Sequence, residues 1–158
     1  MFDDSLGDSG PLHGSADSAP AVPRADAHPK HPRNNAACRD QVLVVDDDEF
    51  SVDMLKRVLQ RRFDVTFTTR ASQALDWIRQ GRRFDAILCD LLMPEMTGMD
   101  LHAQLLPTAP GQVERMIFLT GGAFAKPVRT FLDRIDNPWL AKPFDLRQLM
   151  AMINTVRS

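Results

Sequence analysis

A short apolar run that ends in a carboxylate, between Phe84 and Pro94, sets narrow limits on the fold of this chain. Ala86 to Cys89 has the continuous apolar character of a strand that is buried on both faces of a parallel sheet. Asp90 follows directly, and Pro94 indicates a turn because proline cannot continue a central strand. Open α/β sheets bind ligands outside the carboxyl ends of their strands. Asp90 is therefore a candidate functional residue.

Strand-like and helix-like segments alternate along the rest of the chain. The expected strands are 42–45, 65–68, 86–89, 115–120 and 138–142, and the expected helices are 49–62, 71–78, 98–106, 127–134 and 145–156. This alternation predicts right-handed crossovers and a parallel sheet with helices on both faces, in one domain at residues 40–158. Gly81 is expected to end the second helix, and Asp145 to cap the last. Alternation points Cys89 into the core, whereas His102 is expected at the surface.

Residues 1–39 differ in composition from the rest. They are rich in Asp, Ser, Gly, Ala and Pro without an apolar period, so we interpret them as a disordered leader. The formal net charge of −2 provides no basic field for nucleic acid. No apolar run reaches the roughly 20 residues that cross a bilayer. Only Cys38 and Cys89 are cysteines and no signal peptide is evident, which favours a reduced, cytoplasmic protein without membrane partners.

Polar side chains follow four of the expected strands. Asp46 and Asp47 end the first strand, Asp90 the third, Thr120 the fourth and Lys142 the fifth. Since the carboxyl ends of parallel strands share one edge, these side chains should converge. Clustered carboxylates repel one another unless a cation joins them, and oxygen ligands with room for water suit Mg²⁺. A phosphoryl group could then be transferred to Asp90 and held by Lys142 and Thr120.

Each of these residues has a simpler explanation when it is taken alone. An Asp at a strand end is usually a turn or cap residue, and a lysine before a proline is usually solvated. Their joint occurrence, in this order on these strands, favours a site over five unrelated surface residues.

Four motifs together resemble the receiver domain of two-component response regulators, over residues 40–157. The motifs are 44–48, 90–98, 120–122 and 142–144. The resemblance implies a flavodoxin-like fold, a doubly wound five-stranded parallel sheet of order 2-1-3-4-5 with five helices. It also implies that Asp90 accepts a phosphoryl group from a histidine kinase or a histidine phosphotransfer protein. Such a domain assists its own phosphorylation and dephosphorylation and is not a stand-alone enzyme.

The same resemblance assigns further roles. Asp47 and Asp90 would ligate Mg²⁺, with Asp46 acting through water and the main-chain carbonyl of Leu92 completing the protein ligands. Lys142 matches the invariant lysine of the family, and the bond to Pro143 is expected to be cis, which costs little before proline.

Two positions depart from the common family pattern. Trp139 stands where a Tyr or Phe usually swings inward as Thr120 turns towards the phosphoryl group. The alternative is a half-buried tryptophan that only packs, because an indole is bulkier. Leu92 is apolar where some members carry a polar residue that positions the hydrolytic water, which leaves the rate of dephosphorylation open.

Three functions remain open at this point. The first is a stand-alone receiver that acts on partner proteins through its fourth helix, fifth strand and fifth helix. The second is the receiver segment of a hybrid histidine kinase, since the run 120–124 with Asn137 and Pro138 resembles receivers fused to kinases. The third is an aspartyl-phosphate phosphatase, which is disfavoured because Leu92 occupies the position of its general acid. DNA binding is disfavoured by the balanced charge and the missing helix-turn-helix pattern.

Overall fold

A computed structural model describes residues 39–121 and 125–158 of the chain. The leader predicted for residues 1–39 therefore lies outside the described residues, apart from Arg39. The strands are β1 (Gln41–Val45), β2 (Asp64–Thr68), β3 (Ala86–Asp90), β4 (Met116–Gly121) and β5 (Trp139–Lys142). The helices are α1 (Glu49–Leu59), α2 (Ala71–Arg79), α3 (Gly98–Leu105), α4 (Pro110–Val113), α5 (Lys126–Leu132) and α6 (Leu146–Val156).

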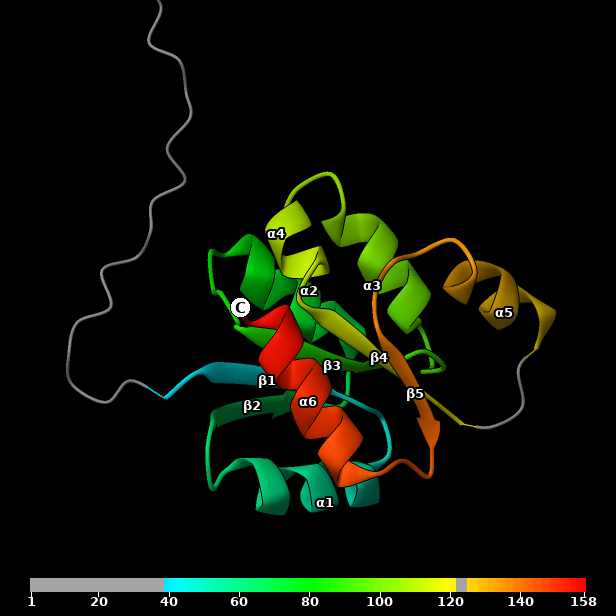
Figure 1. Cartoon of the computed structure of the whole chain (residues 1–158). Coiled ribbons are helices and arrows are strands. Elements are labelled where there is room, and N and C mark those ends of the chain that lie inside the picture. Colours follow the sequence, from blue (N-terminus) through cyan, green and yellow to red (C-terminus); the bar gives the residue numbers. More distant parts are fainter. Residues whose placement is uncertain (1–38, 122–124) are drawn as a thin grey trace, which may run out of the picture. The chain divides into compact units, whose positions relative to one another are not determined.

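The five strands form one parallel sheet with helices on both faces (Figure 1). The strand order is β2-β1-β3-β4-β5, which confirms the predicted topology. Every residue of β3 is buried, as the apolar run between Phe84 and Pro94 predicts. The order places the carboxyl ends of β1 and β3 side by side, with β4 between β3 and β5. No described helix is long and apolar enough to span a membrane.

Two apolar layers join the helices to the sheet. On one face α1 and α6 pack through Val52, Leu55, Leu59, Leu149 and Ile153 against alternate residues of the strands. On the other face α2, α3, α4 and α5 supply Ala71, Ala74, Leu75, Ile78, Leu101, Leu105, Val113, Val128 and Leu132. A helix that buries one apolar stripe in this way keeps its polar side in water, which explains the helical spacing in the sequence.

The helix α4 corrects the predicted number of helices from five to six among the described residues. It has four residues, too few for an apolar period, and Pro110 at its start sets the backbone angle of the first turn. Its buried Gln112 acts as a partner for the backbone of Phe84, two residues before β3. The side-chain carbonyl oxygen accepts from the Phe84 amide at 2.8 Å, and the side-chain amide donates to the Phe84 carbonyl at 3.0 Å.

His102 is half-buried, which corrects its expected place at the surface. Its ring meets the Phe131 ring of α5 edge-on, with 5.3 Å between the centroids, and lies 6.0 Å from the Phe118 ring of β4. Burial lowers the pKa of His102, so the neutral imidazole is favoured. Its position on α3 therefore serves packing between α3 and α5.

Helix ends follow the predicted signals. Gly81 lies just past the end of α2 with a φ of 96°, a left-handed conformation that glycine adopts without strain. The Asp145 carboxylate caps α6 by accepting from the Arg147 amide. At the start of α3, Thr97 and Asp100 form a reciprocal capping box. This box fixes the beginning of α3 close to the end of β3.

Gly98 allows this close approach. A Cβ atom on Gly98 would lie 2.3 Å from the Asp90 carbonyl oxygen and 3.0 Å from the Cys89 sulfur. Both neighbours belong to the central strand, so neither can move without disturbing the sheet. The end of β3 and its Asp90 are therefore held by a contact that only glycine permits.

Replacing Gly98 by alanine should destabilise the domain by about 1–3 kcal/mol, because the added methyl group overpacks this contact. Urea unfolding measures the loss. Gly111→Ala is the matched control, since a Cβ atom there meets nothing within 4 Å. Equal midpoints for the two variants would contradict the close contact.

Candidate functional site

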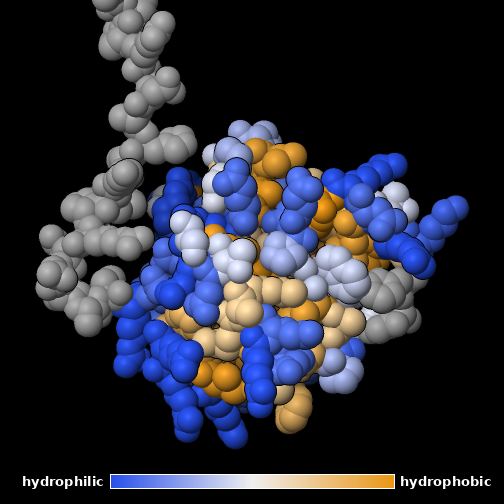
Figure 2. All heavy atoms as spheres, in the orientation of Figure 1, coloured by the Kyte–Doolittle hydropathy of each residue, from blue (hydrophilic) through white to orange (hydrophobic). Residues whose placement is uncertain are grey.

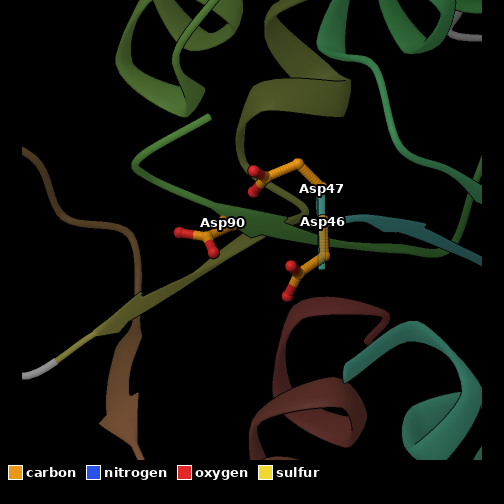
Figure 3. A group of neighbouring side chains, drawn as sticks. All are labelled: Asp46, Asp47 and Asp90. Carbon is orange, nitrogen blue, oxygen red and sulfur yellow. The ribbon is translucent and has the colours of Figure 1, made fainter. Parts of the chain in front are cut away.

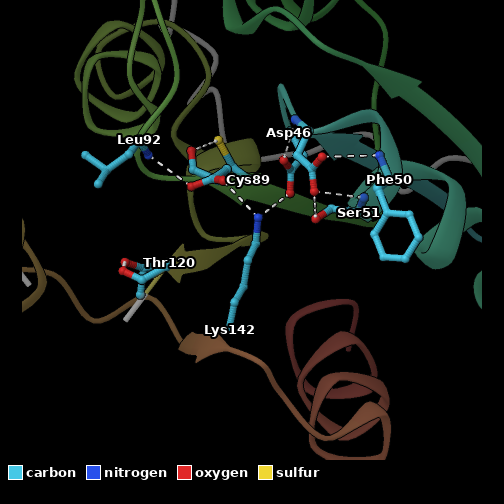
Figure 4. Close-up of polar contacts among 10 residues, drawn as sticks. Asp46, Phe50, Ser51, Cys89, Leu92, Thr120 and Lys142 are labelled. Carbon is cyan, nitrogen blue, oxygen red and sulfur yellow. Dashed lines mark hydrogen bonds and ion pairs between the residues drawn. The ribbon is translucent and has the colours of Figure 1, made fainter. Parts of the chain in front are cut away.

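The carboxyl ends of three strands bring Asp46, Asp90 and Lys142 into direct contact (Figure 4). The Lys142 ammonium donates to Asp46 Oδ2 at 2.6 Å and to Asp90 Oδ2 at 2.9 Å. Lys142 is the last residue of β5, and β4 separates that strand from β3. A long side chain is therefore needed here, because it must cross the end of β4 to reach both carboxylates.

Asp47 completes a cluster of three carboxylates at this edge. One oxygen from each of Asp46, Asp47 and Asp90 lies within 4.8 Å of the others, and the three side chains surround one space in Figure 3. Asp46 is fully buried, Asp90 is 8% exposed and Asp47 is exposed. Three carboxylates facing one ammonium leave net negative charge. Oxygen donors of this kind, open to water on one side, fit a hard divalent cation such as Mg²⁺.

The ionisation of the central residues follows from burial and from their mutual contacts. Burial raises the pKa of Asp46, and the hydrogen bond from Lys142 offsets only part of this shift. Burial acts to lower the pKa of Lys142, but the hydrogen bonds to Asp46 and Asp90 outweigh it and raise the pKa overall. Lys142 therefore stays protonated at neutral pH. Its raised pKa contributes stability below the pKa of an unfolded lysine, and this contribution is lost as the pH rises through the folded value.

Backbone amides orient both carboxylates. Asp46 Oδ1 accepts from the Asp48 amide, and Asp90 Oδ1 accepts from the Leu92 amide, each at 3.0 Å. In both residues Oδ1 is thus held by the turn that follows the strand, while Oδ2 faces Lys142. Asp48 in turn caps α1 by accepting from the amides of Phe50 and Ser51.

The other predicted site residues, Thr120, Trp139 and Pro143, lie on or next to the strands that end at this edge. Thr120 is buried at the end of β4, where its hydroxyl donates to the Gly121 carbonyl at 3.5 Å. Trp139 opens β5 and is 40% exposed. The Lys142–Pro143 bond is cis, as the resemblance implies. The roles of Thr120 and Trp139, and of the Leu92 carbonyl, stay predictions. Residues 122–124, which include the last residue of the third motif, lie outside the described residues.

Two further residues at the site were not singled out from the sequence. Asp48 has the cap role described above, for which its position before an apolar helix was an available signal. Phe50 is 80% exposed in the first turn of α1, because it lies off the apolar face that Val52 and Leu55 bury.

Known proteins share this sequence pattern and this fold. The chain matches the family model of the response regulator receiver domain over residues 42–154. It is 46% identical over 63 residues to the two-component response regulator ORR21 of Oryza sativa subsp. indica, which covers 39% of this chain and 9% of that protein. It is 27% identical over 122 residues to hybrid signal transduction histidine kinase I of Dictyostelium discoideum, which covers 73% of this chain and 7% of that protein.

Among solved structures, the receiver domain of the Francisella response regulator 1452 is similar in fold. Its TM-score is 0.64 at 24% identity, and the match covers 75% of this chain and 97% of that one. The chain thus spans a small part of the two full-length relatives and nearly the whole of this receiver. Taken with the sheet order and the family match, these findings show that the chain belongs to the response regulator receiver domain family of two-component signalling.

Proposed function

We propose that this domain is a phosphoacceptor in a two-component phosphorelay and that Asp90 receives the phosphoryl group. The donor is a phosphohistidine on a histidine kinase or a histidine phosphotransfer protein. The contact of the Lys142 ammonium with both Asp46 and Asp90 is the observation that carries the proposal. It supplies a fixed positive charge beside a carboxylate that is nearly buried yet still reachable from solvent.

The chemistry follows from these positions. An Asp90 oxygen attacks the phosphorus, the phosphorus–nitrogen bond of the phosphohistidine breaks, and the imidazole keeps the electron pair and takes up a proton. Lys142 stays protonated and neutralises charge on the phosphoryl oxygens as it develops. Thr120, at the end of the adjacent strand, would donate its hydroxyl to the phosphoryl group after a rotation of its side chain.

Magnesium is the cofactor that these residues would hold. Asp47 and Asp90 would ligate it directly, with Asp46 acting through water and the Leu92 carbonyl completing the protein ligands. A bound Mg²⁺ neutralises phosphoryl oxygens and so favours transfer. The carboxylate oxygens of the cluster, within 4.8 Å of one another, support this assignment.

Two surfaces fit the partners of such a switch. Phe50 and Leu92, which are 80% and 47% exposed, flank the site and offer apolar contacts to an approaching phosphodonor. Trp139 of β5 and Leu146 of α6, 40% and 37% exposed, support an output surface on α5, β5 and α6. We place both encounters in the cytoplasm.

The likeness to hybrid signal transduction histidine kinase I supports a second arrangement, in which this receiver is one segment of a hybrid kinase. Phosphotransfer from a panel of purified kinases separates the two arrangements. A free receiver should take phosphate from a separate kinase, whereas a hybrid segment should prefer a kinase domain encoded with it.

Asp47→Asn should raise the melting temperature of the metal-free domain, because it removes one of three mutually repelling carboxylates. The same variant should lose most of the stabilisation that Mg²⁺ gives the wild type. Thermal unfolding with and without Mg²⁺ measures both effects. Asp53→Asn, an exposed position on α1, is the control and should behave as wild type. An undiminished response of Asp47→Asn to Mg²⁺ would remove Asp47 from the ligand set.

With Mg²⁺ and acetyl phosphate, the protein should gain a single phosphate that is labile to base and hydroxylamine. Asp90→Asn should gain none, because an amide oxygen does not form the acyl phosphate. Intact-mass spectrometry provides the measurement, and circular dichroism confirms that the variant is folded. Asp76→Asn, exposed on α2, should be phosphorylated as wild type. The same adduct on Asp90→Asn would refute the assignment of the acceptor.

Phosphorylation should change the fluorescence of Trp139, which lies on the strand that ends at Lys142. Trp77 should report little, because it packs on α2 with the Arg82 guanidinium 4.8 Å from its ring. Emission spectra of Trp77→Phe should therefore keep the change, and those of Trp139→Phe should lose it. A full signal in Trp139→Phe would exclude Trp139 as the switch residue.

A further inference from the structure

A groove runs along α5, away from the carboxylate site. Its volume is about 510 Å³, within the range of small ligand and peptide sites. The residues that line it are Lys126, Pro127, Thr130, Phe131 and Arg134. In Figure 2, apolar atoms lie between hydrophilic ones over the area that α5 occupies in Figure 1. The groove therefore combines an apolar wall with charged ends.

The apolar wall is fixed by packing below it. The Phe131 ring meets the Phe118 ring of β4 edge-on, with 5.3 Å between the centroids, and contacts His102 of α3 at the same distance. These contacts place the Phe131 side of α5 towards α3. The groove is thus preformed, because the ring that forms its wall cannot rotate freely between two aromatic neighbours.

The charge on the groove has one sign. Lys126 and Arg134 are both exposed, and neither makes an ion pair with any described residue. Among the described residues no acidic side chain lines the groove, and Asp133, the C-cap of α5, lies outside the lining. Two cations at either end of an apolar wall, with no ion pair to the described part of the chain, favour a ligand with an apolar centre and negative ends.

We propose that this groove binds an extended segment of a partner protein with an acidic residue on each side of an apolar one, at alternate positions. Lys126 begins α5 and Arg134 lies two residues past its end, so a rise of about 1.5 Å per residue places them roughly 12 Å apart. In an extended segment, residues four apart lie roughly 13 Å apart on one face, with the intervening apolar side chain between them. The long cationic side chains cover the difference, so each carboxylate meets one cation while the apolar side chain meets Phe131 and Pro127.

This inference goes beyond the proposed phosphoacceptor function, since nothing in it requires Asp90 or magnesium. It also differs from the output surface on α5, β5 and α6, because the groove lies on the α3 side of α5. The Asp90→Asn variant should therefore bind the segment as tightly as the wild type, which separates a failure of one proposal from a failure of the other.

The test uses a fluorescein-labelled heptapeptide, Gly-Glu-Ala-Phe-Ala-Glu-Gly, and the full chain without phosphodonor. Fluorescence anisotropy should show saturable binding that weakens with salt. Reversing both charges, in Lys126→Glu with Arg134→Glu, should weaken binding about tenfold, because each exposed ion pair contributes only a few-fold. Arg129→Glu is the matched control, since Arg129 is exposed on the same helix but does not line the groove.

Two peptide variants and one NMR measurement test the predicted contacts separately. A peptide with alanine in place of its phenylalanine should bind several-fold more weakly, and one with lysines in place of its glutamates should not bind. Amide chemical shifts of the ¹⁵N-labelled chain should move in α5 when the peptide is added. Equal weakening by Arg129→Glu, or shifts confined to other elements, would overturn the proposal. Sedimentation velocity provides a last check. A dimer of the chain that dissociates when the peptide is added would show that a second copy occupies the groove, and this would also overturn the proposal.

Discussion

The carboxylates of Asp46, Asp47 and Asp90 repel one another at one edge of the sheet, and the ammonium group of Lys142 reduces this repulsion. At an effective dielectric constant near 20, two like charges about 5 Å apart cost about 3 kcal/mol. Lys142 offsets part of this cost by contacting Asp46 and Asp90 at once. The strand order makes this contact possible, because β1 and β3 are neighbours and only β4 lies between β3 and β5.

The strand-end aspartates Asp46 and Asp90 combine a turn role with a contact to Lys142. Asp46 and Asp90 each accept from the amide two residues further on, which is the turn role expected of an isolated aspartate. This turn uses only Oδ1, so Oδ2 remains for Lys142. The same local bond thus forms the turn and orients the second oxygen. A turn role for a strand-end aspartate is therefore no argument against a second contact through its other oxygen.

The order of strands and helices could be predicted because each long element carries its own period, as in the fully buried β3. Three features could not be predicted. The four-residue α4 is held by the bonds of Gln112 to Phe84, which are 28 residues apart. His102 is covered by aromatic rings from two other elements. Phe67 follows the alternation of the expected strand 65–68 but is exposed on the edge strand β2, where only the Lys56 ammonium is placed over its ring. Each case depends on tertiary contacts, which cannot be predicted from the spacing of apolar residues along the sequence.

The convergence at the site was easier to infer than the position of any single side chain, because parallel topology alone brings strand ends together. What topology leaves open is how a change at the site reaches the helices. Thr120 and Phe118 lie two residues apart on β4 and hence on the same face of the sheet. Phe118 in turn packs against Phe131 of α5. A packed route therefore runs from the site to α5 through one strand and one aromatic contact, and it carries a signal if α5 has two stable packings against Phe118.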